Sequence, residues 1–314
     1  MPAETSSPKL AKLLVQHLAK LARSESDLWL LDADLGDSYD INSDVITTFG
    51  PRYIQAGIAE QCMVSVASGL AAMSKRPWVF SFAAFLLSRG YDQIRCGVSQ
   101  MKLPVTLVGA NSGITGIKNG NSHICLNDVA IISSLPHIDI WSPGSEKDVI
   151  YAVKQILERQ QPAYIRLSKF TPAITTEKSQ DCYWLEKQGH DVLLISSGTA
   201  SEWAVDLSLS LKQSVSVSHM HINRIRPLPE KLDTIMRQPF KHIYVIEDHF
   251  SNGGLGDIVA HQYPHLTIHK IGWPQNWLPV MQSINELREQ CSIDTASLRQ
   301  WILEDITPWI QQKL

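Results

Sequence analysis

The chain lacks the charge and the long apolar runs of a protein that binds nucleic acid or spans a membrane. Its 314 residues hold 28 Lys and Arg against 31 Asp and Glu, a formal net charge of -3. Such a balance gives no broad positive field for phosphate backbones or anionic lipid. Charge or proline interrupts the apolar runs before the ~18 residues of a membrane span, and residues 1–12 lack a secretory signal. We therefore expect a cytoplasmic protein with no nucleic acid or membrane as partner.

Cysteine is scarce, and several well-known site motifs are absent. The five cysteines are widely spaced and form no Cys-x-x-Cys pair, so we expect reduced packing residues rather than zinc ligands or a redox pair. There is also no Gly-x-Gly-x-x-Gly, Walker loop, His-Glu-x-x-His or Gly-x-Ser-x-Gly. The chain therefore offers no ready metal-binding set and no simple nucleotide or hydrolase signature.

What the chain does have is an alternation of short apolar runs with amphipathic stretches. We predict strands at 28–31, 78–82, 105–109, 138–141, 163–167, 191–196, 215–221 and 242–246, and helices at 10–21, 60–73, 91–100, 146–159 and 202–211. This order is typical of α/β proteins with mainly parallel sheets. Residues 171–190 are polar and irregular. We therefore predict two doubly wound domains, at 1–175 and 191–314, joined by a linker at 176–190.

The loops after the predicted strands are the places to look for a site, because ligands bind at the carboxyl ends of parallel strands. Three such loops stand out, at 32–40, 109–127 and 247–256. The second contains four glycines and ends near His123, which can donate to an oxyanion or move a proton. An idle surface histidine is equally compatible with the pattern. In the third loop, the glycine cluster at 252–256 fits either a phosphate site or a tight strand-to-helix turn.

Two further features suggest chemistry. Glu60 is a single carboxylate at the start of an otherwise uncharged helix, among small and apolar neighbours. A buried carboxyl needs a partner, and it can share a proton with a ring nitrogen, although a carboxylate that complements the helix dipole is an alternative. Phe82 and Phe85 end a strand three residues apart and can present ring faces to a flat ligand. Core packing is the competing interpretation for these aromatics.

The ordered set of motifs closely resembles the C-terminal half of transketolases, over about residues 10–280. The motifs are Leu31-Asp-Ala-Asp-Leu35, Gly57-Ile-Ala-Glu-Gln61, Phe82-Ala-Ala-Phe85, Tyr91-Asp-Gln-Ile-Arg95, Asn119-Gly-Asn-Ser-His123, Asp128-Val-Ala130, Tyr164-Ile-Arg-Leu167, Glu247-Asp-His249 and Gly253-Gly-Leu-Gly256. The resemblance implies a pyrimidine-binding domain for thiamin diphosphate, followed by a smaller transketolase C-terminal-like domain.

The domain that carries the Gly-Asp-Gly metal-diphosphate motif in that family has no counterpart in this sequence. The resemblance therefore implies a split enzyme, in which an N-terminal subunit holds Mg²⁺ (or Ca²⁺) and the diphosphate. Two copies of each chain would form a heterotetramer. Its activity would be transfer of a two-carbon ketol unit from a ketose (phosphate) to an aldose or aldehyde, through a cofactor carbanion and enamine.

The family roles transfer residue by residue. Glu60 resembles the glutamate that hydrogen-bonds the aminopyrimidine, and Phe82 and Phe85 resemble the aromatics around that ring. Asp34 corresponds to a position near the thiazolium. His123 resembles the histidine that contacts the ketose oxygen, which gives Glu60 and His123 as the catalytic pair.

The substrate positions depart from the family pattern. A histidine and arginines usually hold the sugar phosphate there, whereas this chain has Asn111, Lys169 and Lys9, with Ser38 retained. Asn119 replaces an acidic residue, and lysine lacks the fork geometry of arginine. We therefore expect an unusual substrate, phosphorylated weakly or not at all. Two other interpretations stay open: a decarboxylating thiamin enzyme, of the deoxyxylulose-phosphate synthase or 2-oxoacid dehydrogenase β type, and a non-catalytic assembly subunit.

Overall fold

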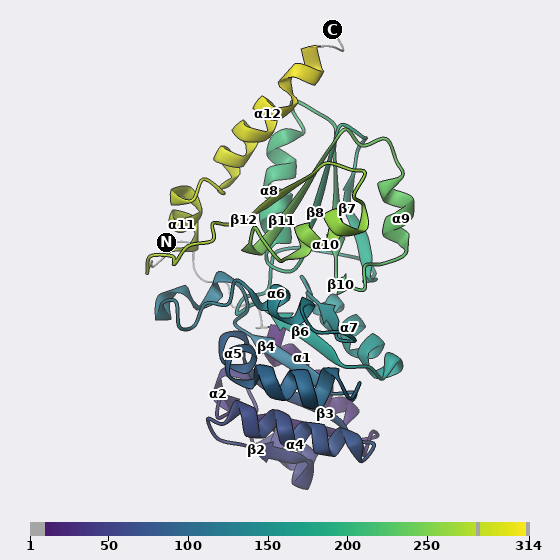
Figure 1. Ribbon diagram of the computed structural model, residues 1–314, viewed down its shortest axis with the longest axis vertical. Coiled ribbons are helices and arrows are strands. Elements are labelled where there is room, and N and C mark those ends of the chain that lie inside the picture. The colour runs from purple at the N-terminus through teal and green to yellow at the C-terminus, as the bar shows by residue number, and fades with distance from the viewer. Residues whose placement is uncertain (1–9, 281–282, 312–314) are drawn as a thin grey trace.

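The computed structural model describes residues 10–280 and 283–311, which form two α/β units, drawn one above the other in Figure 1. The first unit contains a seven-stranded sheet in the order β10-β5-β6-β4-β3-β1-β2, parallel except for β10. Its strands are β1 (Leu28–Asp32), β2 (Tyr53–Gln55), β3 (Arg76–Phe82), β4 (Thr106–Ala110), β5 (Asp139–Trp141), β6 (Ala163–Leu167) and β10 (Arg224–Arg226). The predicted mixed α/β class with mainly parallel sheets is confirmed.

Helices cover both faces of this sheet because the buried strands are apolar on both sides. One face packs on α1 (Leu10–Leu21) and α7 (Glu146–Arg159), and the other packs on α4 (Glu60–Ala72) and α5 (Ala83–Gln93). Ser145 caps α7, since its Oγ accepts a hydrogen bond from the Asp148 amide at 3.2 Å. Shorter helices complete the unit: α2 (Gly36–Tyr39), α3 (Ser43–Phe49), η1 (Gly50–Arg52), η3 (Ile114–Asn119) and α6 (Asp128–Ser133).

The second unit is a five-stranded sheet in the order β12-β11-β8-β9-β7. Its strands are β7 (Cys182–Lys187), β8 (Val192–Ser196), β9 (Val217–Ile222), β11 (His242–Phe250) and β12 (Ile268–Trp273). One face carries α8 (Ala200–Leu211) and α12 (Thr295–Gln311), and the other carries α9 (Lys231–Met236) and α10 (Leu255–Gln262), with α11 (Ile284–Gln290) before α12. One apolar cluster continues from α4 and α5 to the α9–α10 face, so the two units share a core.

Three elements differ from the sequence-based expectation. Within the expected linker, residues 182–187 form the edge strand β7, which pairs antiparallel with β9. Strand β10 leaves the second half of the chain to join the first sheet. The helix expected at 91–100 begins earlier, as α5, and continues as the π-helix Ile94–Ser99. These elements depend on pairing or packing partners that are remote in sequence, which local patterns do not indicate.

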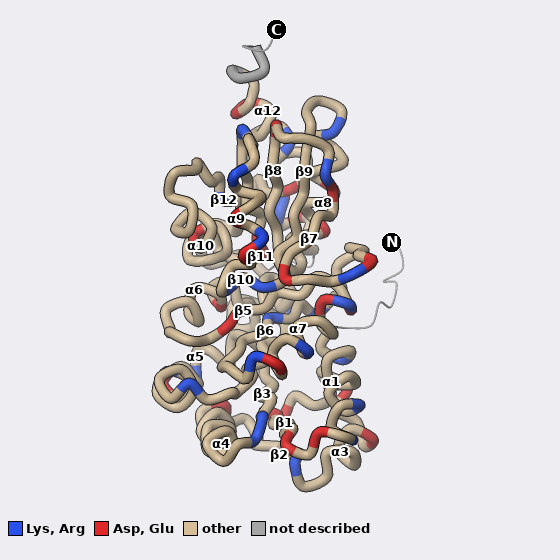
Figure 2. The backbone as a smooth tube through the Cα atoms, turned by 90° about the vertical axis from the view of Figure 1, so that its right-hand side faces the viewer, with Lys and Arg blue, Asp and Glu red and all other residues tan. Residues whose placement is uncertain are grey.

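Charge is distributed without a dominant sign on either unit. Figure 2 shows basic and acidic segments interspersed along the backbone of both units. Among the described residues, no helix combines the length and apolar character needed to cross a bilayer. The interspersed charges agree with the nearly equal numbers of basic and acidic residues, and the helix finding agrees with the short apolar runs of the sequence.

Two buried polar side chains, those of His219 and Ser196, contact each other inside the second unit. His219 on β9 is fully buried, and its Nε2 lies 2.7 Å from Ser196 Oγ. Burial, assisted by neighbouring His221, lowers the pKa of His219 from its ordinary value of 6.5 to about 3. The folded protein therefore holds a neutral imidazole under conditions in which the unfolded chain holds a protonated one.

The sign of the resulting pH dependence follows from proton linkage. Below pH 6.5 the unfolded state binds a proton that folded His219 does not, so this residue makes the protein less stable as the pH falls toward 3. We expect the unfolding free energy of the wild type, relative to His219→Gln, to fall by roughly 1 kcal/mol per pH unit between about pH 6 and 4. Urea unfolding across that range measures it, and a constant difference would contradict the assignment.

Candidate functional site

A small cavity lies at the carboxyl ends of β1, β3, β4 and β6, as the strand order predicted. Its volume is about 190 Å³, and it is lined by Ala11, Ser38, Tyr39, Phe82, Ala110, Asn111, Asn119, Ser168 and Lys169. The structure thus brings together Ser38, Asn111, Asn119 and Lys169, which the sequence assigned to substrate binding. Their hydroxyl, amide and ammonium groups suit a polyhydroxylated or anionic ligand.

This cavity opens toward a larger one between the two units. Asn111, Asn119 and Lys169 line both, and Trp203 and Arg288 also line the second cavity, whose volume is about 730 Å³. The site therefore has room for a ligand longer than the small cavity alone accommodates. Lys9, the remaining substrate candidate, lies outside the described residues.

An aromatic wall adjoins the small cavity. The ring centroids of Phe82 and Phe85 lie 5.7 Å apart, and His123 lies 5.1 Å from Phe85 and 6.1 Å from Phe82. Ser122 Oγ is 2.9 Å from His123 Nδ1. Phe82 and Phe85 are only half-buried, so their rings are available to a ligand rather than enclosed in the core.

Glu60 occupies the first position of α4 and is 3% exposed. Its carboxylate accepts hydrogen bonds from Arg89 Nη1 at 3.1 Å to each oxygen and from Ser81 Oγ at 3.3 Å. The Arg89 guanidinium also lies over the Phe85 ring, 4.5 Å from its centroid. A flat cationic donor thus sits between a buried carboxylate and an aromatic face.

Sequence reasoning missed Arg89. The available signal was that a buried glutamate needs a partner, together with an arginine four residues after Phe85, hence on the same side of a helix. The expected helix at 91–100 placed Arg89 before the helix rather than inside α5, so this relation was not visible.

Asp34 bonds to a neighbouring strand. It is exposed, has a φ of 60°, and accepts a hydrogen bond from Gln55 Nε2 at 2.6 Å. Neighbouring Asp32 is the buried carboxyl of this loop. It accepts from the Leu35 amide at 3.1 Å, and burial raises its pKa to about 6.

The loop that carries His123 is held by the second unit. Asp248, at the end of β11, is buried, and its carboxylate accepts from the Ile114 amide at 3.1 Å and from Trp273 Nε1 at 2.8 Å. Burial raises the pKa of Asp248 to about 6. The position of the loop therefore depends on a residue 134 positions further along the chain.

Arg166 joins the same two units. Its Nε donates to Asp128 Oδ2 at 2.9 Å and its Nη2 donates to the Asp248 carbonyl at 2.9 Å. Tyr164 also donates to Asp128, at 2.8 Å. Asp128, Tyr164, Arg166 and Asp248 belong to three of the motifs that carry the family resemblance. Hydrogen bonds inside the protein connect the four residues to one another.

The glycine cluster at 252–256 forms a tight turn. The Glu247 carboxylate accepts from the Leu255 amide at 2.7 Å and the Gly256 amide at 3.1 Å, at the start of α10. A Cβ on Gly254 would lie 1.8 Å from Glu247 Oε2. An internal anion thus already occupies this helix N-terminus, which favours the turn over the phosphate site.

A family model, two relatives and a solved structure name transketolases, and 1-deoxy-D-xylulose-5-phosphate synthases also match, at 24–27% identity. The family model described as "Transketolase, pyrimidine binding domain" matches residues 6–171. The 6-deoxy-6-sulfo-D-fructose transketolase subunit SqwH of Clostridium sp. (strain MSTE9) is 31% identical over 254 residues, 78% of each chain. A subunit of the apulose-4-phosphate transketolase of Actinobacillus succinogenes is 25% identical, covering 94% of this chain and 97% of that protein. A solved structure described as "Split gene transketolase, inactive beta4 tetramer" superposes with a TM-score of 0.83 at 23% identity, covering 95% and 98%.

Gly113 tests the clamp between Asp248 and the His123 loop. It has a φ of +70°, and an added Cβ would lie 2.0 Å from Asp248 Oδ2. Gly120 in the same loop has a φ of +77°, but its Cβ would meet only Val280 Cγ2, at 3.5 Å. Gly120→Ala should therefore cost only the strain of its positive-φ backbone, roughly 1–3 kcal/mol. Gly113→Ala should cost roughly 2 kcal/mol more, because Asp248 must move.

Urea unfolding of the two variants measures this difference. Equal losses of unfolding free energy would show that Asp248 adjusts without cost and that the clamp is unimportant for stability.

Proposed function

This chain belongs to the transketolase family through its pyrimidine-binding domain, and from that membership we propose that it is the C-terminal subunit of a split, thiamin-diphosphate-dependent transketolase. It acts with an N-terminal subunit that holds Mg²⁺ and the cofactor diphosphate. The reaction is transfer of a two-carbon ketol unit from a ketose to an aldehyde acceptor. The assembly contains two copies of each chain. Support comes from relatives of nearly equal length that are named as transketolase subunits.

One arrangement carries the proposal: the Glu60 carboxylate and the Phe85 ring hold a flat hydrogen-bond donor between them. In this chain the donor is the Arg89 guanidinium. An aminopyrimidine ring can be held in the same way as this guanidinium. It has a hydrogen-bond donor to direct at a carboxylate and a flat face to pack against an aromatic side chain. Arg89 has a side chain that is 47% exposed, so it can swing into solvent when the donor of a ligand takes its place at Glu60. The residues therefore fit the pyrimidine end of the cofactor.

The chain's own groups have distinct tasks in this reaction. When bound, thiamin diphosphate supplies the electron sink for breaking and forming carbon–carbon bonds. Glu60 holds or releases a proton at the ring nitrogen from a site closed to water. Phe82 and Phe85 position the ring by contact. His123, which touches both aromatics, lies where it can donate to a substrate oxygen or move its proton.

The small cavity binds the remainder of the sugar. Ser38, Asn111 and Asn119 offer neutral donors and acceptors for hydroxyl groups, and Lys169 supplies a cation. The relatives reported above are named for a sulfo sugar and a sugar phosphate. One lysine in place of arginine forks binds such an anion as a point charge, with less geometric selection. We infer a sugar with at most one anionic group at the end remote from its carbonyl.

Glu60→Gln tests the catalytic role. In the enzyme reconstituted with its N-terminal partner, this variant should lower kcat by about 10²-fold or more, because the amide cannot exchange a proton with the ring. Size-exclusion chromatography should show unchanged assembly. Exposed Glu146→Gln on α7 is the matched control and should retain full activity.

Two results would end this proposal. Full turnover by Glu60→Gln would place the chemistry elsewhere or assign the chain a scaffolding role. Rapid CO₂ release from pyruvate by the wild-type assembly, without ketol transfer, would make it a decarboxylating enzyme.

Lys169→Ala tests the anion contact. It should raise KM about tenfold for a ketose that carries phosphate or sulfonate, a loss of ~1.4 kcal/mol, and leave kcat unchanged. KM for an uncharged ketose should stay the same. Lys154→Ala is the control, because exposed Lys154 on α7 lines neither cavity. An equal change for charged and uncharged ketoses would show that Lys169 acts through packing.

A further inference from the structure

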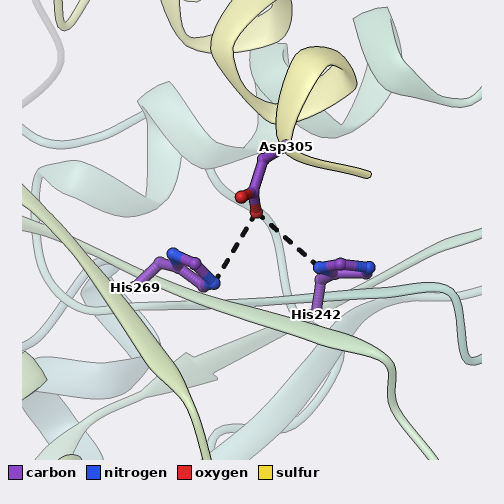
Figure 3. Close-up of side chains that lie close together, drawn as sticks. All are labelled: His242, His269 and Asp305. Atoms are coloured by element: carbon purple, nitrogen blue, oxygen red, sulfur yellow. Dashed lines mark ion pairs between the residues drawn. The ribbon is translucent and has the colours of Figure 1, made fainter. Parts of the chain in front are cut away.

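Two imidazoles and a carboxylate converge on the second unit, outside the site described above. His242 begins β11, His269 lies at the start of β12, and Asp305 reaches down from α12 (Figure 3). Asp305 Oδ2 lies 3.7 Å from His242 Nδ1 and 3.6 Å from His269 Nε2. The three nearest donor atoms all fall within 4.8 Å of one another.

These separations suit a shared ion better than direct hydrogen bonds. At 3.6 and 3.7 Å the pairs are beyond ordinary hydrogen-bond length. Two ligands of a tetrahedral ion with bonds near 2.1 Å lie about 3.4 Å apart. The carboxylate-to-imidazole separations are within a few tenths of an ångström of that value, and all three ligand atoms lie within 4.8 Å of one another, so a small adjustment of His242 brings the set to an ion.

We propose that His242, His269 and Asp305 form a binding site for a divalent transition-metal ion of the zinc class, with water completing the coordination. Imidazole nitrogens and a carboxylate oxygen are the ligand types that Zn²⁺ and Co²⁺ accept. The side chains are 18%, 25% and 31% exposed, in that order, so the ion has a path from solvent.

Neighbouring groups already orient two of the three ligands. Tyr244 donates to Asp305 Oδ2 at 2.6 Å, which fixes the carboxylate. The Tyr244 ring also stacks on His269, with centroids 4.8 Å apart and an interplanar angle of 27°. Trp301 of α12 packs its edge against both rings. Such outer contacts are characteristic of metal sites, because they hold the ligands in place before the ion arrives.

The site lies far from the catalytic candidates, so its role is structural. Asp248 lies six positions after His242 in β11, about 20 Å along an extended strand. The ligands come from two strands and from α12, and β12 is the edge of its sheet. A bound ion therefore fastens the C-terminal helix to the sheet edge. This inference does not depend on the proposed ketol transfer.

Metal titration of the full-length chain tests the site. After EDTA treatment and removal of the chelator, calorimetry with Zn²⁺ should show one ion per chain with a Kd in the micromolar range or tighter. Co²⁺ should give the visible absorption of a tetrahedral or five-coordinate site. Zn²⁺ should also raise the Tm, because the ion binds the folded state.

Two variants separate ligation from packing. His269→Phe keeps a ring against Tyr244, and Asp305→Asn keeps an acceptor for the Tyr244 hydroxyl, so both should remain folded by circular dichroism. Each should weaken Zn²⁺ binding at least tenfold and abolish the Tm increase. Exposed His265→Ala is the control and should bind as the wild type does. No stoichiometric binding at 100 µM Zn²⁺, or equal binding by both variants and the wild type, would overturn the proposal and leave an ion-pair cluster.

Discussion

The arrangement of the candidate site depends on one buried carboxylate, that of Asp248. It extends from the second sheet into the first unit and accepts the Ile114 amide at the start of the loop that ends with His123. A carboxylate removed from water is unfavourable unless donors compensate it. The Ile114 amide, the Trp273 indole and the nearby Arg166 guanidinium provide that compensation. The second unit is therefore part of the site's framework.

The same constraint explains why the recognised motifs fall into two classes. Some of their residues surround the cavities, as Phe82, Phe85 and His123 do. Others, among them Asp128 and Arg166, bond with one another, with Tyr164 and with Asp248 inside the protein. A match to these motifs therefore indicates residues that hold the two units together as well as residues that surround the cavities.

The sequence predicted the parts of this fold whose signals are local. Strands such as β8 are nearly continuous apolar runs, and two of the expected loops, 32–40 and 109–127, contain Ser38 and Asn111, which line the small cavity. The sequence did not predict β7 and β10, because each is defined by pairing with a strand from elsewhere in the chain. Contacts between residues on separate elements were also missed. The grouping of His242, His269 and Asp305 depends on how α12 packs across two strands, which no spacing records.

The contact between Glu60 and Arg89 shows how the candidate site can be stable before a ligand binds to Glu60. A buried carboxylate without a counter-charge would destabilise the isolated chain. Arg89 neutralises it while resting on Phe85, and it remains partly in solvent, so it can leave when another donor replaces it at Glu60. Any flat donor that binds Glu60 competes with this guanidinium, and the competition favours a ligand that brings further contacts from a second chain. A pyrimidine anchored by a diphosphate on a partner subunit has that property, whereas a free ring does not.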